Sequence, residues 1–156
     1  MASTPRVLVF DSSAMLAYLN GEPEGSVVAA LFKLPDATFF AHSVNLAEVF
    51  YDFGPPSIPQ NLRDAQQALV QLQVTCRVQE RNDLDAAFWQ DVALLIAERR
   101  AMPRDAVKPK QVPRLALGDA FGLALSRRLN GEFVTKDRTE IEPMHDANFC
   151  RALFIR

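Results

Sequence analysis

Short apolar runs alternate along the chain with longer segments in which apolar residues recur at helical spacing. The short runs, of which Arg6–Phe10 is the first, are rich in β-branched and aromatic side chains and are typical of buried strands. Gly, Pro, Asn and Asp lie between the runs, where they stop one element and start the next. This pattern predicts strands at Arg6–Phe10, Thr38–Ala41, Val74–Val78, Glu132–Thr135 and Ala152–Ile155.

Helices are expected between these strands, at Ala14–Leu19, Glu24–Leu34, Ser43–Phe53, Asn61–Gln71, Asn82–Arg100 and Leu117–Leu129. Met102–Arg114 contains three prolines and is expected to be a loop. Strands that alternate with helices imply crossover connections and a mainly parallel sheet. The predicted fold class is therefore α/β, a three-layer sandwich with a mainly parallel central sheet flanked by helices, in a single domain over residues 1–156.

The composition is that of a globular protein, with 49% hydrophobic and 23% charged residues. No apolar run approaches the ~18 residues that a membrane-spanning helix needs, and Met1–Pro5 lacks the basic-then-apolar layout of a secretory signal. Cys76 and Cys150 are too few and too far apart for a zinc motif, so we expect them to be reduced, partly buried thiols. These features predict a cytoplasmic protein without a membrane association.

The net charge of −2 is not typical of a nucleic-acid-binding protein, which is usually basic. One segment nevertheless gathers six basic residues around a single acid, Asp105. We interpret it either as a basic rim beside an acidic site or as a solvated, mobile connector. The basic residues are Arg99, Arg100, Arg104, Lys108, Lys110 and Arg114.

Four acidic residues fall where strands end or helices begin. Asp11 directly follows the first predicted strand, and Asp137 follows the fourth. Asp119 lies in the first turn of the last predicted helix, and Glu48 lies about one and a half turns into the third. Because ligands of an open parallel sheet bind at the carboxyl ends of its strands, we expect the four carboxylates to converge there.

Each acid also has a purely structural interpretation. Asp11 and Asp119 could cap helices, Asp137 could be a turn residue, and Glu48 could lie on a solvated helix face. Carboxylates crowded together, however, repel one another and raise each other's pKa unless a cation lies between them. Oxygen ligands suit Mg²⁺ or Mn²⁺, and the chain offers no His–Cys cluster for zinc.

Four segments resemble, in order, the successive signatures of PIN domains, most closely those of VapC-like toxins of toxin–antitoxin pairs. The segments are Val9–Ala14 (VFDSSA), Val44–Val49 (VNLAEV), Leu117–Ala120 (LGDA) and Val134–Arg138 (VTKDR). By this resemblance the catalytic and metal-binding acids are Asp11, Glu48, Asp119 and Asp137, and the supporting hydroxyl residues are Ser13 and Thr135. The segment from Glu140 to Asn148 does not align with the family, which leaves a metal role for Asp146 open.

The resemblance implies an endoribonuclease that cleaves RNA phosphodiester bonds at a Mg²⁺ or Mn²⁺ site. Basic residues near the acids are candidates for phosphate contacts, although charged turns would look the same. The toxin branch also implies a small antitoxin protein that blocks the acidic cleft, and self-association into a homodimer. The candidate RNA-binding residues are Arg104, Lys108, Lys110, Lys136 and Arg138.

The sequence also bears on functions other than a nuclease. A receiver-like signalling domain would need an acidic pair after the first strand, where this chain has Asp11 followed by two serines. It would also need a phosphoacceptor after a central strand, whereas Val74–Val78 is followed by Gln79 and Glu80. A PIN fold used in RNA processing, or kept only for binding RNA or protein, remains an alternative. Loss of one of the four acids would favour the binding module, but none is missing.

Overall fold

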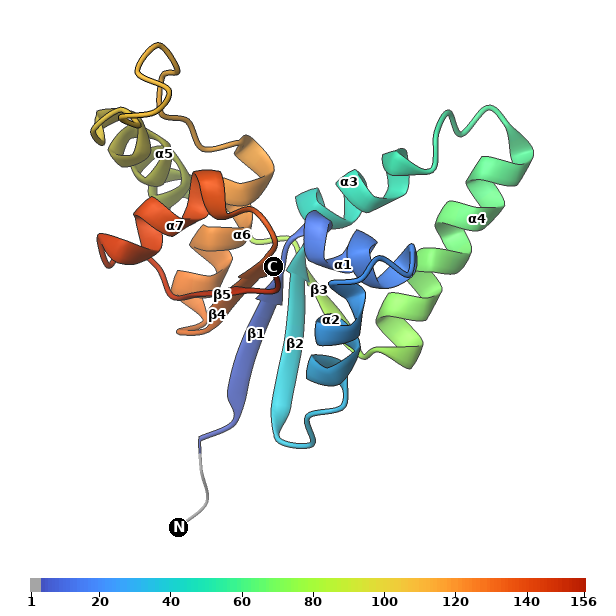
Figure 1. Ribbon diagram of the computed structural model, residues 1–156. Coiled ribbons are helices and arrows are strands. Elements are labelled where there is room, and N and C mark those ends of the chain that lie inside the picture. Colours follow the sequence, from blue (N-terminus) through green and yellow to red (C-terminus); the bar gives the residue numbers. More distant parts are fainter. Residues whose placement is uncertain (1–3) are drawn as a thin grey trace.

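The computed structural model describes residues 4–156, so part of the Met1–Pro5 segment and the first residues of the predicted 1–156 domain lie outside it. Within residues 4–156, five parallel strands form one sheet in the order β3-β2-β1-β4-β5 (Figure 1). The mainly parallel sheet predicted from the sequence is confirmed. The strands are β1 (Arg6–Phe10), β2 (Ala37–His42), β3 (Val78–Arg81), β4 (Glu132–Thr135) and β5 (Ala152–Phe154).

Helices cover both faces of the sheet, which confirms the predicted three-layer α/β architecture. Successive side chains of a strand point to opposite faces. In β1, Leu8 and Phe10 pack with α1 and α2 on one face, whereas Val9 packs with α5 and α6 on the other (Figure 1). The helices are α1 (Ser12–Leu19), α2 (Gly25–Phe32), α3 (Ser43–Asp52), α4 (Pro59–Val70), α5 (Ala86–Ala101), α6 (Leu117–Arg128) and α7 (Arg138–Asp146).

The strand order reverses beside β1. From β1 the chain builds β2 and β3 outward on one side, and it then returns to add β4 and β5 on the other side. Phe10 is in register with Val134, and the backbone N–H of Asp11 donates to the Val134 carbonyl at 3.1 Å. Open α/β sheets bind ligands at such a switch in strand order. The residues that follow β1 and β4 therefore lie side by side at the edge where a ligand is expected.

The strand predicted at Val74–Val78 is wrong for most of its length. The chain leaves α4 through a π-helical turn at Gln71–Thr75, and β3 begins only at Val78. Leu72 is fully buried by this turn, whereas Val74, a good strand former, is 73% exposed. Arg77, with φ of 61°, reverses the chain between the turn and the strand. Packing of the turn against the core therefore overrides the local β preference.

Helix α7 was not predicted, because it is short and contains Pro143 in its interior. A proline lacks the N–H that would bond to the carbonyl four residues earlier, here that of Thr139. Arg99 of α5 compensates: its Nη2 donates to the Thr139 carbonyl at 3.2 Å and its Nε to the Glu140 carbonyl at 3.1 Å. Arg99 is only 8% exposed. It is therefore part of the core, and the interpretation that places it in a basic rim is corrected.

Two further expectations concern the thiols and the membrane. Cys76 and Cys150 are buried free thiols, as predicted. Among the described residues, no helix combines the length and the apolar character needed to cross a membrane.

The pairing of Arg99 with the start of α7 can be tested by a double-mutant cycle. We expect Arg99→Ala to lower the free energy of unfolding by about 1–3 kcal/mol, because two buried carbonyls lose their donor. Pro143→Ala restores an N–H for the Thr139 carbonyl, so Arg99→Ala should be milder in that background by about 1 kcal/mol. Urea denaturation of the four proteins measures both values.

Arg100→Ala, which removes an exposed neighbour on the same helix, is the matched control and should leave the free energy of unfolding nearly unchanged. If Arg99→Ala lowered the free energy of unfolding equally in the wild type and in Pro143→Ala, Arg99 would not be compensating for the N–H that Pro143 lacks.

Candidate metal centre

Asp11 occupies the junction between β1 and α1. It is buried, and as the N-cap of α1 its Oδ1 accepts the Ala14 N–H at 2.9 Å. Oδ1 also accepts from the Ser13 hydroxyl at 2.6 Å, and Oδ2 accepts from the Thr135 hydroxyl at 2.5 Å. Burial raises the pKa of Asp11 to about 6, although these hydrogen bonds oppose the shift. The interpretation of Asp11 as a helix cap is correct. Capping does not prevent the same carboxylate from taking part in a metal site.

Two hydroxyl groups tie the segment after β1 to the segment after β4. Thr135 donates to Asp11 while its Oγ1 accepts the Asp137 backbone N–H at 3.0 Å. Ser13 likewise donates to Asp11 while its Oγ accepts the Lys136 backbone N–H at 3.2 Å. Because each hydroxyl both donates and accepts, it fixes the position of Asp11 relative to the start of α7.

Glu48 reaches the same edge from α3. The Ser12 hydroxyl donates to its Oε2 at 2.7 Å, and Asn45, one turn earlier on α3, donates to the Gly118 carbonyl at 3.0 Å. A Cβ atom on Gly118 would lie 2.0 Å from Glu48 Oε1. The glycine that precedes Asp119 is thus what lets the Glu48 carboxylate pack against the start of α6. Glu48 lies between the segments that begin α1 and α6.

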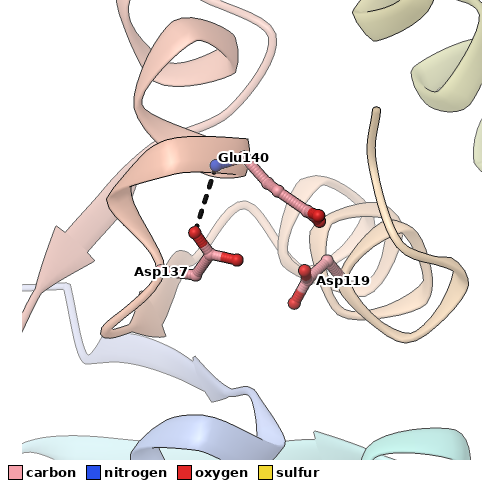
Figure 2. Close-up of side chains that lie close together, drawn as sticks. All are labelled: Asp119, Asp137 and Glu140. Carbon is pink, nitrogen blue, oxygen red and sulfur yellow. Dashed lines mark hydrogen bonds between the residues drawn. The ribbon is translucent and has the colours of Figure 1, made fainter. Parts of the chain in front are cut away.

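The tightest group of acids combines two predicted residues with one that sequence reasoning missed. Among the described residues, carboxylate oxygens of Asp119, Asp137 and Glu140 all lie within 4.8 Å of one another. Figure 2 shows the three side chains pointing toward a common space between α6 and α7. Asp137 is the N-cap of α7, and its Oδ1 accepts the Glu140 N–H at 3.1 Å. An acid at the N-cap with Glu three residues later resembles a capping box, a signal that could have predicted both α7 and Glu140.

The side chain of Glu140 joins the starts of two helices. Its Oε1 accepts from Arg114 Nε at 2.9 Å, and its Oε2 accepts the Ala116 backbone N–H at 2.9 Å. Ala116 is the N-cap of α6 and has no capping side chain of its own. In an ordinary capping box the glutamate bonds to the N-cap of its own helix, whereas Glu140 serves the neighbouring one. It thereby fixes the spacing between Asp119 on α6 and Asp137 on α7.

The basic groups around the acids compensate their charge only in part. Burial, followed by the negative charges of Asp11, Glu140 and Asp137, raises the pKa of Asp119 to about 9. Arg114 is the ion-pair partner of Glu140, but its side chain is 76% exposed and is screened by water. A divalent cation between the carboxylates would remove the repulsion, and the all-oxygen donor set suits Mg²⁺ or Mn²⁺. Asp119, Asp137 and Glu140 could hold such an ion. Of the other two predicted acids, Asp11 adds its negative charge to Asp119, and Glu48 packs at Gly118, the residue before Asp119.

The candidate RNA-binding residues are distributed unevenly around this edge. Lys136 and Arg138 line a hollow of about 560 Å³ beside Asp137, where they pair with Glu22 at 2.5 Å and Glu142 at 2.9 Å. On the other side of Asp137, Lys108 lines a second cavity, which Arg104 and Lys110 do not line. Asp146, whose role the sequence leaves open, is exposed at the opposite end of α7 and lies outside the acidic group.

The raised pKa of Asp119 predicts how the metal-free protein responds to pH. An acid with a folded-state pKa of about 9 and an unfolded value near 3.8 opposes folding when it ionises, so stability is lost as pH rises between these values. In chelator, Asp119→Asn should therefore raise the free energy of unfolding at pH 8 by at least about 1.4 kcal/mol, the equivalent of one pKa unit. The difference should shrink toward pH 4. Urea denaturation at both pH values measures it.

Asp36→Asn is the matched control, because Asp36 is exposed in the turn that precedes β2, away from the acidic group. Asp36→Asn removes a negative charge but does not relieve the repulsion among Asp119, Asp137 and Glu140. Its effect on the free energy of unfolding should therefore be the same at pH 4 and pH 8. A stability difference for Asp119→Asn that is independent of pH would contradict the electrostatic explanation.

Comparison with known proteins finds likeness in structure rather than in sequence. No protein-family model matches the chain, and no curated protein matches it. Chains of three solved complexes are similar to it at 15% identity. One is VapBC2 from Rickettsia felis bound to a DNA fragment from their promoter, with a TM-score of 0.66 over 95% of this chain and 98% of that one. The second is VapBC-1 from nontypeable Haemophilus influenzae, with a TM-score of 0.63 over 96% of this chain and 98% of that one. The third is FitAcB from Neisseria gonorrhoeae, with a TM-score of 0.55 over 95% of this chain and 97% of that one. The resemblance seen in the sequence motifs is thus confirmed at the level of the fold, and the chain has a PIN-like α/β fold.

Proposed function

We propose that this protein is a metal-dependent endoribonuclease, and that it serves as the toxin of a toxin–antitoxin pair. The observation that carries the proposal is the acidic group at the switch in strand order, in which Asp119, Asp137 and Glu140 lie within 4.8 Å of one another. Carboxylates held this close, with only the exposed Arg114 paired to one of them, are typical of a divalent-cation site. The PIN-like fold places the group where α/β proteins bind ligands.

In this mechanism the chain's own residues orient the acids and the RNA. Asp119, Asp137 and Glu140 would hold Mg²⁺ or Mn²⁺, whose charge would polarise the scissile phosphate and lower the pKa of the attacking water. Thr135 and Ser13 hold Asp11 against the start of α7, and Glu140 fixes the distance between α6 and α7. The carboxylates therefore need little rearrangement when they bind a cation, which is the condition for efficient electrostatic catalysis.

The RNA backbone would cross the molecule at Asp137. The hollow beside this residue is lined by Lys136, Arg138 and Arg156, whose charges suit phosphate groups. Lys136 and Arg138 already pair with Glu22 and Glu142, so phosphates would compete with these ion pairs. The Arg138–Glu142 pair is exposed and therefore weak in water, whereas the Lys136–Glu22 pair is partly buried. Single-stranded or looped RNA is the expected substrate, because a recessed acidic site requires a splayed backbone.

Metal dependence and the role of the acids can be tested together. We expect cleavage of single-stranded RNA in Mg²⁺ or Mn²⁺ and none in chelator. Asp11→Asn and Asp119→Asn should lower the rate by at least about tenfold, because each removes a carboxylate from the site. Gly118→Ala should also lower it, since the added Cβ would displace the Glu48 carboxylate. Gel-based cleavage of a fluorescent RNA measures the rates.

Asp36→Asn again serves as the control and should cleave at the wild-type rate, and circular dichroism should show that every variant is folded. Full activity of Asp11→Asn, or cleavage that persists in chelator, would refute the nuclease proposal.

The toxin assignment predicts a small protein partner. The solved complexes that share the fold are VapBC and FitAcB toxin–antitoxin structures. An antitoxin would place a basic side chain against the carboxylates of the acidic group. Co-expression with the neighbouring small gene should therefore give a complex in size-exclusion chromatography, in which RNA cleavage is inhibited. A lone, fully active chain after co-expression would contradict the toxin branch.

Self-association remains a prediction. The apolar residues of α1 and α2 are candidates for a dimer surface. Two of them, Val28 and Leu31, are buried in the core and cannot form such a surface. Leu16 and Leu19 are partly buried and also pack against that core. The packing of these residues supports a core role for them. Size-exclusion chromatography of the free chain would show whether a homodimer forms.

A further inference from the structure

A cavity of about 530 Å³ lies between α7 and the connector, the segment Met102–Ala116 that joins α5 to α6. Figure 1 shows the connector as the yellow-to-orange loop that projects beyond α5 and α6. Asp137 and Glu140 of the acidic group form part of the cavity wall, so the cavity opens directly beside the candidate metal centre. Its volume is within the range of about 300–1,000 Å³ that is usual for small-ligand sites.

Hydrogen bonds fix the connector and attach its end to α7. Arg114 and Ala116, at the end of the connector, are both bonded to the Glu140 carboxylate at 2.9 Å. Arg104 donates to the Pro109 carbonyl at 3.1 Å, and the Gln111 N–H donates to the Lys108 carbonyl at 3.0 Å. Prolines in the connector restrict it further, which reduces the entropy lost when a ligand binds.

The lining combines apolar residues with polar and charged groups. Pro103 and Pro113 of the connector and Pro143 of α7 all line the cavity, together with the polar side chains of Gln111 and Thr139 and the acids Asp105, Asp137 and Glu140. Flat apolar surfaces and a small number of hydrogen-bonding groups are what an unstacked nucleobase requires, since its faces pack and its edges donate and accept.

One cation completes this chemistry. Lys108 also lines the cavity, and within residues 4–156 its ammonium group has neither an ion pair nor a hydrogen bond. The two other basic residues of the lining, Arg99 and Arg114, are bonded to Thr139 and Glu140. Lys108 is therefore the cation that remains available for a phosphate group.

We propose that this cavity binds one nucleotide of the RNA substrate, with its base between the prolines and its phosphate toward Lys108, next to the bond that is cut. The proposal rests on the proposed ribonuclease function and adds a base-reading site to it. Because Asp137 belongs to both the cavity and the acidic group, a nucleotide in the cavity adjoins the phosphate at the candidate metal centre. The expected consequence is a base preference at one position beside the cleaved bond.

Binding can be measured apart from cleavage, on the intact chain in chelator. Each of the four ribonucleoside 5′-monophosphates, and inorganic phosphate, would be titrated while the ¹H–¹⁵N NMR signals of the connector are followed. We expect at least one nucleotide to shift the Gln111 side-chain amide saturably, and inorganic phosphate to leave it unmoved. Gln111→Ala and Thr139→Val should each weaken that nucleotide by about fivefold, the equivalent of one hydrogen bond.

Gln90→Ala is the matched control, because Gln90 is an exposed glutamine on α5 that does not line the cavity. It should bind the nucleotide as the wild type does. Equal shifts with inorganic phosphate, or equal weakening in Gln90→Ala and Gln111→Ala, would overturn the nucleotide site.

Cleavage supplies the second readout. Sequencing the ends produced from a random single-stranded RNA should show a base preference that Gln111→Ala relaxes and Gln90→Ala keeps. The two proposals fail separately: nucleotide binding without any RNA cleavage would refute the nuclease and leave the cavity site standing. Cleavage with no nucleotide bound and no base preference would refute the cavity site alone.

Discussion

Parallel pairing of β1 with β4 is the constraint on which the acidic edge depends. Both strands run in the same direction and are in register at Phe10 and Val134, so the chain emerges from them at the same level. The residues that follow, Asp11 and Asp137, are then linked through the Thr135 hydroxyl, which bonds to both. Without this pairing the two acids, which are far apart in the sequence, would have no reason to meet.

Holding carboxylates together requires a scaffold that offsets their repulsion. The structure uses helix starts for this purpose: Asp11 caps α1, Asp137 caps α7, and Asp119 lies in the first turn of α6. The N-terminus of a helix favours negative charge through its free N–H groups and its dipole. Capping and metal binding are therefore compatible roles for these acids, because a capping carboxylate still has free lone pairs. The compensation is incomplete, as the raised pKa of Asp119 indicates.

Basic residues near the site divide into those that build it and those that are available to a ligand. Arg99 is buried beneath α7 and substitutes for the N–H that Pro143 lacks, while Arg114 anchors the connector to Glu140. Lys108, in the same basic segment, lines the cavity, and within residues 4–156 its ammonium group has no hydrogen bond or ion pair. Basic residues that are neighbours in the sequence thus have different roles. Arg99 and Arg114 contact α7, whereas Lys108 lines the cavity.

The sequence by itself determined the α/β class, four of the five strands, and the placement of Asp11, Asp119 and Asp137 at one edge of the sheet. These follow from local hydrophobic patterning and from the geometry of parallel sheets, in which strand ends share an edge. Only the tertiary structure decided the start of β3, the continuation of α7 through Pro143 and the position of Glu140 against the start of α6. Each of these depends on a contact with a distant segment: the packing of Leu72, the Arg99 guanidinium beneath Pro143, and the Ala116 N–H at Glu140. Local pattern carries no information on such contacts, because the partner residues are separated in sequence and meet only when the helices pack on the sheet.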